Sequence, residues 1–285
     1  MEKRSRVAIV AGGSYGIGKV CSAILAESGM NVAILSRKRK EGLEAVDELR
    51  RFDTKAIHIE TDVSDKEQVK KSIAQVINEF QRIDVLVNNA GIVSSLKYFF
   101  EQTDEDWDQV IKANLYGTFY MMKEVAPIMI KQKYGRIINI SSGAARSGSC
   151  GRANYAVSKS GIEMLAMTAA KELGEFGITV NVIRPTFTVT PLTLGRGYNF
   201  DAIAKKIPRK RVGVPEDVAR MVGFLVKEES EFITGQIISV DGGWGLSMNG
   251  ITDELAPLRK MGSNAGGICK SEETDVEHKD RTNSE

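Results

Sequence analysis

The sequence has few of the residues that mark disulfide-bonded or metal-binding proteins. Its 285 residues include only three Cys and two His. The cysteines (Cys21, Cys150 and Cys269) match neither a disulfide framework nor a zinc spacing, and two His are too few for a His-based metal site. We therefore predict no metal site, a structural or surface role for His58, and inert thiols at Cys21 and Cys150 in a reducing compartment.

Long apolar runs and a strong net charge are also lacking. No apolar run approaches the roughly 18 residues of a membrane-spanning helix, and the N-terminal residues lead into a short strand rather than a signal-peptide core. The chain has 39 basic and 37 acidic side chains, a net charge of +2. This balance argues against nucleic-acid and membrane-surface partners. We expect a soluble, cytoplasmic protein whose partners are small molecules.

A glycine turn between a strand and a helix is the first motif along the chain. Residues 6–11 are almost wholly apolar, as in a strand buried on both faces of a parallel sheet, and residues 19–28 have a helical pattern. The turn between them consists of Gly12, Gly13, Ser14, Tyr15, Gly16, Ile17 and Gly18. Such a turn lets the backbone and a helix N-terminus approach a pyrophosphate. The spacing differs from G-x-G-x-x-G, and a turn without a ligand is the alternative.

The end of the second predicted strand, at residues 31–36, favours a phosphorylated dinucleotide. An NAD enzyme has an acidic residue here to accept from the ribose 2′-hydroxyl. This chain has Ser36 and Arg37 instead. A cation without a carboxylate suits a 2′-phosphate, so we predict NADP(H). Lys38 to Lys40, taken singly, are interpreted as a solvated basic turn before the helix at 41–51.

The remaining pattern alternates strands with helices. Further strands are predicted at 55–60, 83–87, 136–140, 178–184 and 236–240, with helices at 65–80, at 105–131, after Tyr155 and from Pro215 onward. The alternation implies right-handed crossovers and one parallel sheet in an α/β domain. The helical region at 105–131 is expected to bend or break near Pro127, and Asn114 within it could be an exposed residue. The irregular segment at 186–212 is typical of a lid or binding loop.

Tyr155 and Lys159 lie four residues apart at the start of a helical pattern and therefore share one helix face. A nearby ammonium lowers the pKa of a phenol, which would make Tyr155 usable as a general acid or base. Ser142 follows the strand at 136–140 and could hydrogen-bond the same substrate oxygen. A packed Tyr, a surface Lys and a capping Ser are the structural alternative.

Taken together, the motifs of residues 5–245 resemble the short-chain dehydrogenase/reductase family. The resemblance rests on the glycine turn, Asp62-Val63, Asn88-Asn89-Ala90-Gly91, Asn114, Ser142, Tyr155-x-x-x-Lys159, Arg184-Pro185, residues 208–217, and the segments at 233–236 and 240–243. It implies a doubly wound, seven-stranded parallel Rossmann-like sheet, a nicotinamide cofactor and a homotetramer or homodimer.

The resemblance also implies roles for individual residues. Asn114, Ser142, Tyr155 and Lys159 take the catalytic positions, with Asn114 holding a relay water and Lys159 lowering the pKa of Tyr155. With Ser36 and Arg37 from the second strand, the predicted cofactor contacts are Gly12, Ser14, Tyr15, Gly16, Ile17, Gly18, Asp62, Val63, Asn89, Gly91, Tyr155, Lys159, Thr188 and Thr190. Two positions depart from the family pattern. Ala11 replaces a Thr whose hydroxyl braces the loop at 88–91, and Thr186 replaces a Gly.

We therefore predict an NADPH-dependent oxidoreductase that interconverts a carbonyl and a secondary alcohol. The sequence favours a free small or cyclic ketone, because Phe176 stands where carrier-protein reductases usually have an Arg. A 3-oxoacyl-thioester reductase is the alternative, supported by Lys133 and by the five cations Lys205, Lys206, Arg209, Lys210 and Arg211. A non-catalytic NADPH-binding regulator is an alternative of another class. Beyond the domain at 1–245 we predict a packed extension at 246–270 and a disordered tail at 271–285.

Overall fold

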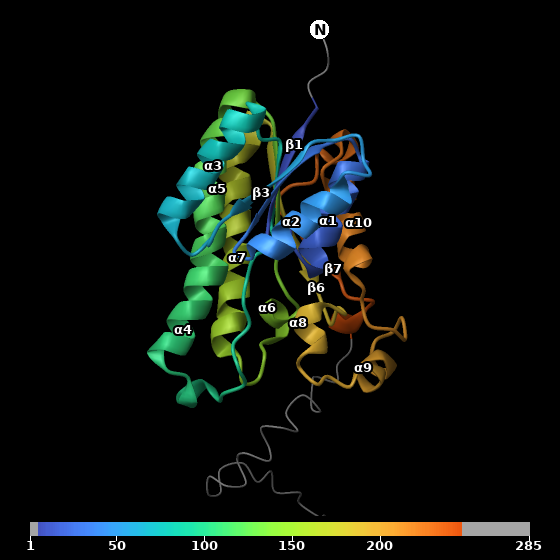
Figure 1. The fold of residues 1–285 in the computed structure, drawn as a ribbon. Helices are drawn as coiled ribbons and strands as arrows, with labels where there is room; N and C mark the ends of the chain where they lie inside the picture. Colours follow the sequence, from blue (N-terminus) through green and yellow to red (C-terminus); the bar gives the residue numbers. More distant parts are fainter. Residues whose placement is uncertain (1–4, 247–285) are drawn as a thin grey trace, which may run out of the picture. The chain divides into compact units, whose positions relative to one another are not determined.

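Seven parallel strands form the framework of the computed structural model, which describes residues 5–246 (Figure 1). Their order in the sheet is β3-β2-β1-β4-β5-β6-β7. The strands are β1 Val7–Ala11, β2 Asn31–Ser36, β3 Ala56–Glu60, β4 Val85–Asn88, β5 Gly135–Ile140, β6 Ile178–Pro185 and β7 Ile237–Val240. The predicted doubly wound, seven-stranded parallel sheet is confirmed.

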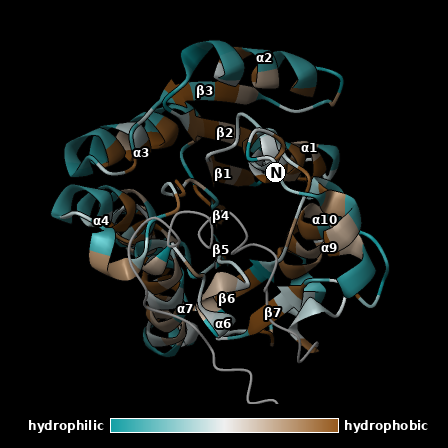
Figure 2. Ribbon diagram, turned by 90° about the horizontal axis from the view of Figure 1, so that it is seen from below, coloured by the Kyte–Doolittle hydropathy of each residue, from teal (hydrophilic) through white to brown (hydrophobic). Residues whose placement is uncertain are grey.

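Helices cover both faces of the sheet (Figures 1 and 2). Helices α3, α5 and α7 pack on one face, and α1, α2 and α10 pack on the other. The helices are α1 Gly16–Glu27, α2 Arg39–Leu49, α3 Lys66–Phe80, α4 Asp104–Val110, α5 Gly117–Gln132, α6 Ala144–Ser147, α7 Ala153–Leu173, α8 Pro191–Leu194, α9 Phe200–Lys206 and α10 Pro215–Leu225. Short 3-10 turns lie at Phe99–Glu101, Gly174–Phe176, Glu228–Ser230 and Trp244–Leu246.

Strand β1 explains why the pattern of residues 7–11 is wholly apolar. Successive side chains of a strand point to opposite faces. Val7 and Ile9 therefore enter the core under α3, α5 and α7, whereas Ala8 and Val10 enter the core under α1, α2 and α10. Both faces exclude water, and all five side chains of β1 are buried. The strand thus contributes to two hydrophobic cores at once.

The strand order reverses beside β1, which pairs with β2 on one side and with β4 on the other. In open α/β sheets, ligands bind outside the carboxyl ends of the strands at such a reversal. The glycine turn after β1 and the loop after β4 both start at this edge. Helices α6, α8 and α9 lie at the same end of the sheet, at the bottom of Figure 1. The fold therefore gathers the predicted motifs at one edge.

The helical region at 105–131 is interrupted at a different place from the one predicted. Helix α5 runs through Pro127 without a break, and the irregularity is a π-helical turn at Ile111–Tyr116 that contains Asn114. Turns of this kind are frequent at functional sites. The expectation of a break at Pro127 was wrong, and so was the alternative of an exposed Asn114, whose side chain is fully buried.

The segment at 186–212 is more ordered than predicted, because it contains the short helices α8 and α9. The predicted extension and tail lie outside the described residues, apart from Leu246. Within residues 5–246, no helix is long and apolar enough to cross a membrane. The same part of the chain holds no cluster of His, Cys, Asp and Glu that could bind a metal ion.

Ala11 leaves a polar atom without a partner. It lies opposite Asn88 on the neighbouring strand. The Asn88 amide nitrogen donates to Asn139 Oδ1 at 2.8 Å, but the Asn88 side-chain oxygen is buried with no hydrogen bond. Directly opposed side chains on parallel strands share one face of the sheet. A hydroxyl at position 11 could therefore donate to this oxygen.

We expect Ala11→Thr to raise the free energy of unfolding by about 1 kcal/mol, the typical contribution of one satisfied buried hydrogen bond. Chemical denaturation measures the difference. Ala11→Val is the matched control, because it has nearly the same shape and no hydroxyl. Equal stabilisation by Val and Thr would mean that packing, and not the Asn88 oxygen, is responsible.

Candidate active site

The glycine turn is pressed against the loop that follows β4. Gly12 has a φ of +75°, and a Cβ placed on it would lie 2.8 Å from the backbone of Ala90. A Cβ on Gly18 would lie 2.1 Å from the carbonyl oxygen of Gly12. The Asn89 side chain donates to that same carbonyl at 3.0 Å. Only glycine fits these two positions, and Asn89 fixes the turn to the loop.

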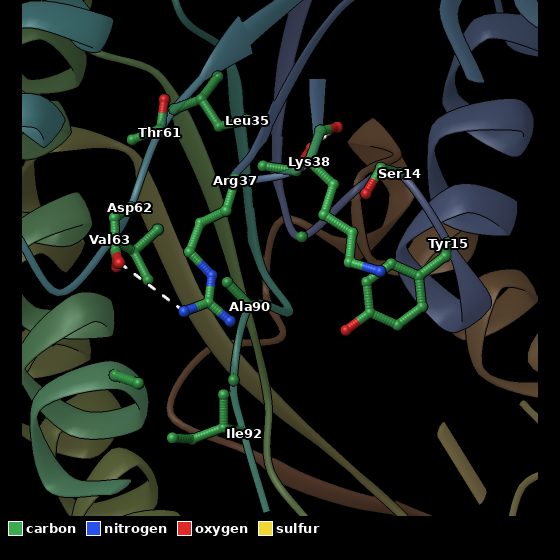
Figure 3. A pocket seen from close by; sticks show the side chains of 14 residues that line it. Ser14, Tyr15, Leu35, Arg37, Lys38, Thr61, Asp62, Val63, Ala90 and Ile92 are labelled. Carbon is green, nitrogen blue, oxygen red and sulfur yellow. Dashed lines mark hydrogen bonds and ion pairs between the residues drawn. The ribbon is translucent and has the colours of Figure 1, made fainter. Parts of the chain in front are cut away.

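A pocket opens between this turn and the ends of β2 and β3 (Figure 3). Eight of the predicted cofactor residues line it, namely Gly12, Ser14, Tyr15, Ser36, Arg37, Asp62, Val63 and Gly91. The other predicted cofactor residues, Gly16, Ile17, Gly18, Asn89, Tyr155, Lys159, Thr188 and Thr190, are not part of its lining. Thr190 is nevertheless close to the turn, because its methyl group lies 3.5 Å from the place of a Cβ on Gly16.

Sequence reasoning missed six residues of this pocket: Leu35, Lys38, Thr61, Ala90, Ile92 and Ala113. Most of them are small or apolar neighbours of the motif residues and carry no chemical signal of their own. Lys38 was interpreted as solvated, but its side chain extends along the pocket toward Tyr15 in Figure 3. The sequence signal for Lys38 was its position just after β2, which ends without an acidic residue.

Strand β2 ends at the pocket without an acidic residue, and the cations Arg37 and Lys38 follow it in the lining. Arg37 is exposed, and its guanidinium lies 3.8 Å from a carboxylate oxygen of Asp62. The Ser36 hydroxyl lies 3.0 Å from His58 Nε2. Burial lowers the pKa of His58, which keeps its imidazole neutral. His58 is thus a structural partner of Ser36, in agreement with the structural role predicted for it.

Tyr155 and Ser142 come together beyond the carboxyl end of β5. Their hydroxyl groups are joined by a hydrogen bond, which lowers the pKa of Tyr155. Burial has the larger effect and raises the pKa of the phenol above its ordinary value of 10. The hydroxyl of Tyr155 is therefore protonated at neutral pH and can donate.

Lys159 is buried one helical turn after Tyr155. Its ammonium donates to the carbonyl oxygen of Ile140 at 2.8 Å and lies 5.8 Å from the centroid of the Tyr155 ring. Burial lowers the pKa of Lys159 to about 8, although the carboxylate of Glu163 opposes this change. The lowering of the Tyr155 pKa by Lys159 stays a prediction. The guanidinium charges of Arg152 and Arg196 lower this pKa.

Asn114 acts as a brace between the loop after β4 and helix α7. Its side-chain oxygen accepts from the backbone N–H of Ile92 at 2.7 Å. Its amide nitrogen donates to the Ile92 carbonyl and to the Ser158 hydroxyl, both at 3.0 Å. Both amide hydrogens are therefore used within the protein. The relay water that the resemblance implied at Asn114 stays a prediction.

Comparison with known proteins identifies the family. The sequence model of the family described as enoyl-(acyl carrier protein) reductase matches residues 11–245. This chain belongs to the short-chain dehydrogenase/reductase family. It is 39% identical over 241 residues to a 3-oxoacyl-[acyl-carrier-protein] reductase of Staphylococcus epidermidis, which covers 84% of this chain and 98% of that protein. A reductase of the same name from Thermotoga maritima is 39% identical over 246 residues, 85% of this chain and 99% of that protein.

Two solved structures are also similar. The structure of gox2181 has a TM-score of 0.81 and 33% identity, and the match covers 85% of this chain and 96% of that chain. Xylitol dehydrogenase with bound NAD+ has a TM-score of 0.80 and 29% identity, covering 85% of this chain and 100% of that chain. The protein is thus an oxidoreductase that acts on CH–OH donors or the corresponding carbonyls and uses a nicotinamide cofactor.

The residues of the pocket fit such a dinucleotide. The hydroxyl of Ser14, in the glycine turn, is buried and has no hydrogen-bond partner within residues 5–246. A buried donor without a partner destabilises the fold unless a ligand accepts its hydrogen bond. A phosphate oxygen at the turn would accept this hydrogen bond. The Thr186 departure does not disturb the site by backbone strain, since the described non-glycine residues with positive φ are Gln81, Lys133 and Lys210.

The depressed pKa of Lys159 predicts a stability change with pH. Below about pH 8 the folded and unfolded states both hold the proton, and the buried ammonium destabilises the fold. Between about pH 8 and the ordinary value of 10.5, only the unfolded state holds it, so stability rises with pH. We expect Lys159→Met to be more stable than the wild type at pH 7, by a margin that shrinks above pH 8.

Urea denaturation of both proteins from pH 7 to pH 10 measures the difference between their free energies of unfolding. Groups that titrate alike in both proteins do not contribute to this difference. A stability difference that stays constant over this range would show that burial does not destabilise the charged form of Lys159.

Proposed function

We propose that the protein is an NADPH-dependent reductase of a 3-oxoacyl group. The observation that carries the proposal is the protonated Tyr155 hydroxyl, hydrogen-bonded to Ser142 at the sheet edge where the dinucleotide pocket lies. Several similar proteins, at 38 to 40% identity, are 3-oxoacyl-[acyl-carrier-protein] reductases by name, which supports the 3-oxoacyl substrate. The bound nicotinamide would supply the hydride to the carbonyl carbon.

Tyr155 would donate its proton to the carbonyl oxygen as negative charge develops there, and Ser142 would hydrogen-bond the same oxygen. Burial favours the neutral phenol before the reaction. The nearby guanidinium group of Arg196 would stabilise the phenolate that remains. Lys159, held by the Ile140 carbonyl, would position the cofactor ribose beside Gly91, where its ammonium lies 3.7 Å from the place of a Cβ. Asn114 would hold the loop after β4 against α7 through its bonds to Ile92 and Ser158.

NADPH is the proposed cofactor because Arg37 and Lys38 line the pocket where β2 ends without an acidic residue. Arg37→Asp should remove the preference for NADPH over NADH, since a charge-assisted contact to a phosphate corresponds to roughly ten- to a hundredfold in affinity. The measurement is kcat/KM with each cofactor. Lys40→Ala is the matched control, because this cation is exposed and is not part of the pocket lining. A wild type without a preference for NADPH would refute the cofactor choice.

Tyr155→Phe should lower kcat by at least about a hundredfold, the typical contribution of a positioned general acid. NADPH affinity, measured by the fluorescence of the bound cofactor, should remain nearly unchanged. Tyr134→Phe serves as the control, because Tyr134 lies at the amino end of β5, the opposite edge of the sheet. Residual activity of more than a few per cent in Tyr155→Phe would assign the proton transfer to another group.

A free small or cyclic ketone is the second candidate substrate, and Phe176 is the observation that favours it. This side chain is partly buried and packs against the core below α7 instead of offering a cation. The basic segment, residues 205–211, also has a weaker positive charge than the sequence suggested. Its Arg211 forms two hydrogen bonds to the Asp217 carboxylate, at 2.6 and 2.8 Å. Lys133 is exposed, which favours carrier docking.

The deciding experiment compares kcat/KM for an acetoacetyl thioester on acyl carrier protein, the same thioester on a short thiol that carries a neutral amide, and free cyclic ketones, at low and moderate salt. The proposal expects both thioesters to be reduced. A carrier advantage that fades as salt rises would support docking through the basic segment. Reduction of the cyclic ketones alone would overturn the 3-oxoacyl proposal in favour of the second candidate.

Self-association as a homotetramer or homodimer is also proposed. Large apolar side chains are exposed along α4, the π-helical turn, α5 and α7, where a monomer would leave them in water. They are Trp107, Tyr116, Phe119, Val157 and Met164. Sedimentation equilibrium measures the assembly, and a monomer at micromolar concentration would refute it.

A further inference from the structure

Arg152 is a buried cation without an acidic partner. It immediately precedes α7 and is only 8% exposed. Its Nε atom has no hydrogen-bond partner, and no carboxylate within residues 5–246 forms an ion pair with its guanidinium. Buried charges in proteins are normally paired or hydrogen-bonded, because their desolvation is otherwise uncompensated. The Arg152 guanidinium is therefore suited to bind an anion.

The surroundings of Arg152 belong to the segment that follows β6. Its guanidinium carbon lies 5.9 Å from the centroid of the Tyr198 ring, at the outer limit of a cation–π contact. Tyr198 packs edge-on against Phe187 at 5.6 Å, and Phe187 packs edge-on against Trp244 at 5.5 Å. Arg152 borders this aromatic cluster through Tyr198, and the residue as a whole is 8% exposed. A charge in such a site interacts more strongly with a bound anion than an exposed cation does.

The reaction centre lies within electrostatic reach of Arg152. Arg152, Arg196 and Tyr198 are among the charged and titratable groups that act on Tyr155, in addition to the hydroxyl of Ser142. Arg196 is fixed by hydrogen bonds to the carbonyl oxygens of Val93 and Ser94, at 2.9 and 3.4 Å. Arg152 has no corresponding bonds. Of the two guanidinium groups, Arg152 is therefore the one whose hydrogen-bonding capacity is left for a ligand.

We propose that Arg152 binds a carboxylate of the substrate, so that this enzyme acts on an oxo acid whose carboxylate lies a few bonds from the reducible carbonyl. A guanidinium matches a carboxylate with paired N–H donors. The proposal rests on the 3-oxoacyl reduction proposed above and narrows its substrate. Arg152 is a specificity-determining residue of that reaction.

The carboxylate could come from either of two sources. In a free 3-oxo acid it is the acid group itself, two carbons from the ketone. In a thioester of a short 3-oxo diacid it is the far end of the acyl chain, and the thioester remains available for a carrier. A simple acetoacetyl thioester has no carboxylate and would leave Arg152 unpaired.

Two matched pairs of substrates test the proposal on the full chain with NADPH. The first pair is acetoacetate and its neutral ethyl ester, and the second is the monothioester of 3-oxoglutarate and an acetoacetyl thioester of the same thiol. We expect Arg152→Gln to lower kcat/KM by about tenfold or more for the anionic member of at least one pair, chiefly through KM. The neutral members should change less than about threefold, and Arg152→Lys should recover part of the loss.

Arg50→Gln is the matched control. Arg50 is an exposed residue that follows α2 and pairs with Asp47, and its replacement should change none of the values. Loss confined to acetoacetate assigns the free acid, whereas loss confined to the 3-oxoglutaryl thioester assigns the diacid. An equal loss for the anionic and neutral members, or no loss for either anion, would overturn the proposal and leave Arg152 with a structural role.

Failure of the proposed function has a different outcome. If the wild type reduces none of the four compounds, the 3-oxoacyl proposal falls, and binding then decides the question for Arg152. Calorimetric titration of malonate, a non-reducible dicarboxylate, into the protein with NADP+ should give about tenfold weaker binding in Arg152→Gln. Absence of malonate binding to the wild type, or equal affinity in both proteins, would overturn the carboxylate site.

Discussion

The close approach of the glycine turn to the loop after β4 is the constraint on which the site depends. A side chain on Gly12 would overlap the backbone of Ala90, and one on Gly18 would overlap the carbonyl of Gly12. The hydrogen bond from Asn89 to that carbonyl holds the two segments together. Because β1 and β4 are neighbours at the reversal of strand order, this contact forms at the carboxyl edge of the sheet. The dinucleotide pocket and the Tyr155 centre both border it.

The carboxyl edge of the sheet also holds two buried cationic side chains. Lys159 and Arg152 are each more than nine-tenths buried, and neither forms an ion pair with a described carboxylate. Desolvation lowers the pKa of Lys159 and raises that of Tyr155, so both shifts favour neutral groups. Below about pH 8 the Lys159 ammonium and the Arg152 guanidinium are nevertheless charged, and ligands can neutralise them. The site suits a phosphorylated cofactor at one end and an oxyanion or carboxylate at the other.

Much of the fold could be predicted because its signals are local. Apolar runs, the glycine turn and helical periodicity identified the seven strands and most of the helices, with ends displaced by a few residues. The motif residues Ser142, Tyr155 and Lys159 were identified in the same way, and the structure brings them to one edge. Long-range effects were not predictable. The burial of Asn114 depends on Ile92 and Ser158, which lie far from it in the sequence. Arg152 has no local pattern, and only its packing reveals it.

The central claim is that one continuous site holds a phosphorylated dinucleotide against the glycine turn and presents its reactive end to Tyr155. A crystal structure of the complex with NADP+ and malonate tests it most directly. The account predicts a pyrophosphate oxygen that accepts from Ser14, a 2′-phosphate beside Arg37, and a nicotinamide ring facing the Tyr155 hydroxyl. A cofactor that leaves Ser14 unpaired, or whose nicotinamide lies away from Tyr155, would contradict it.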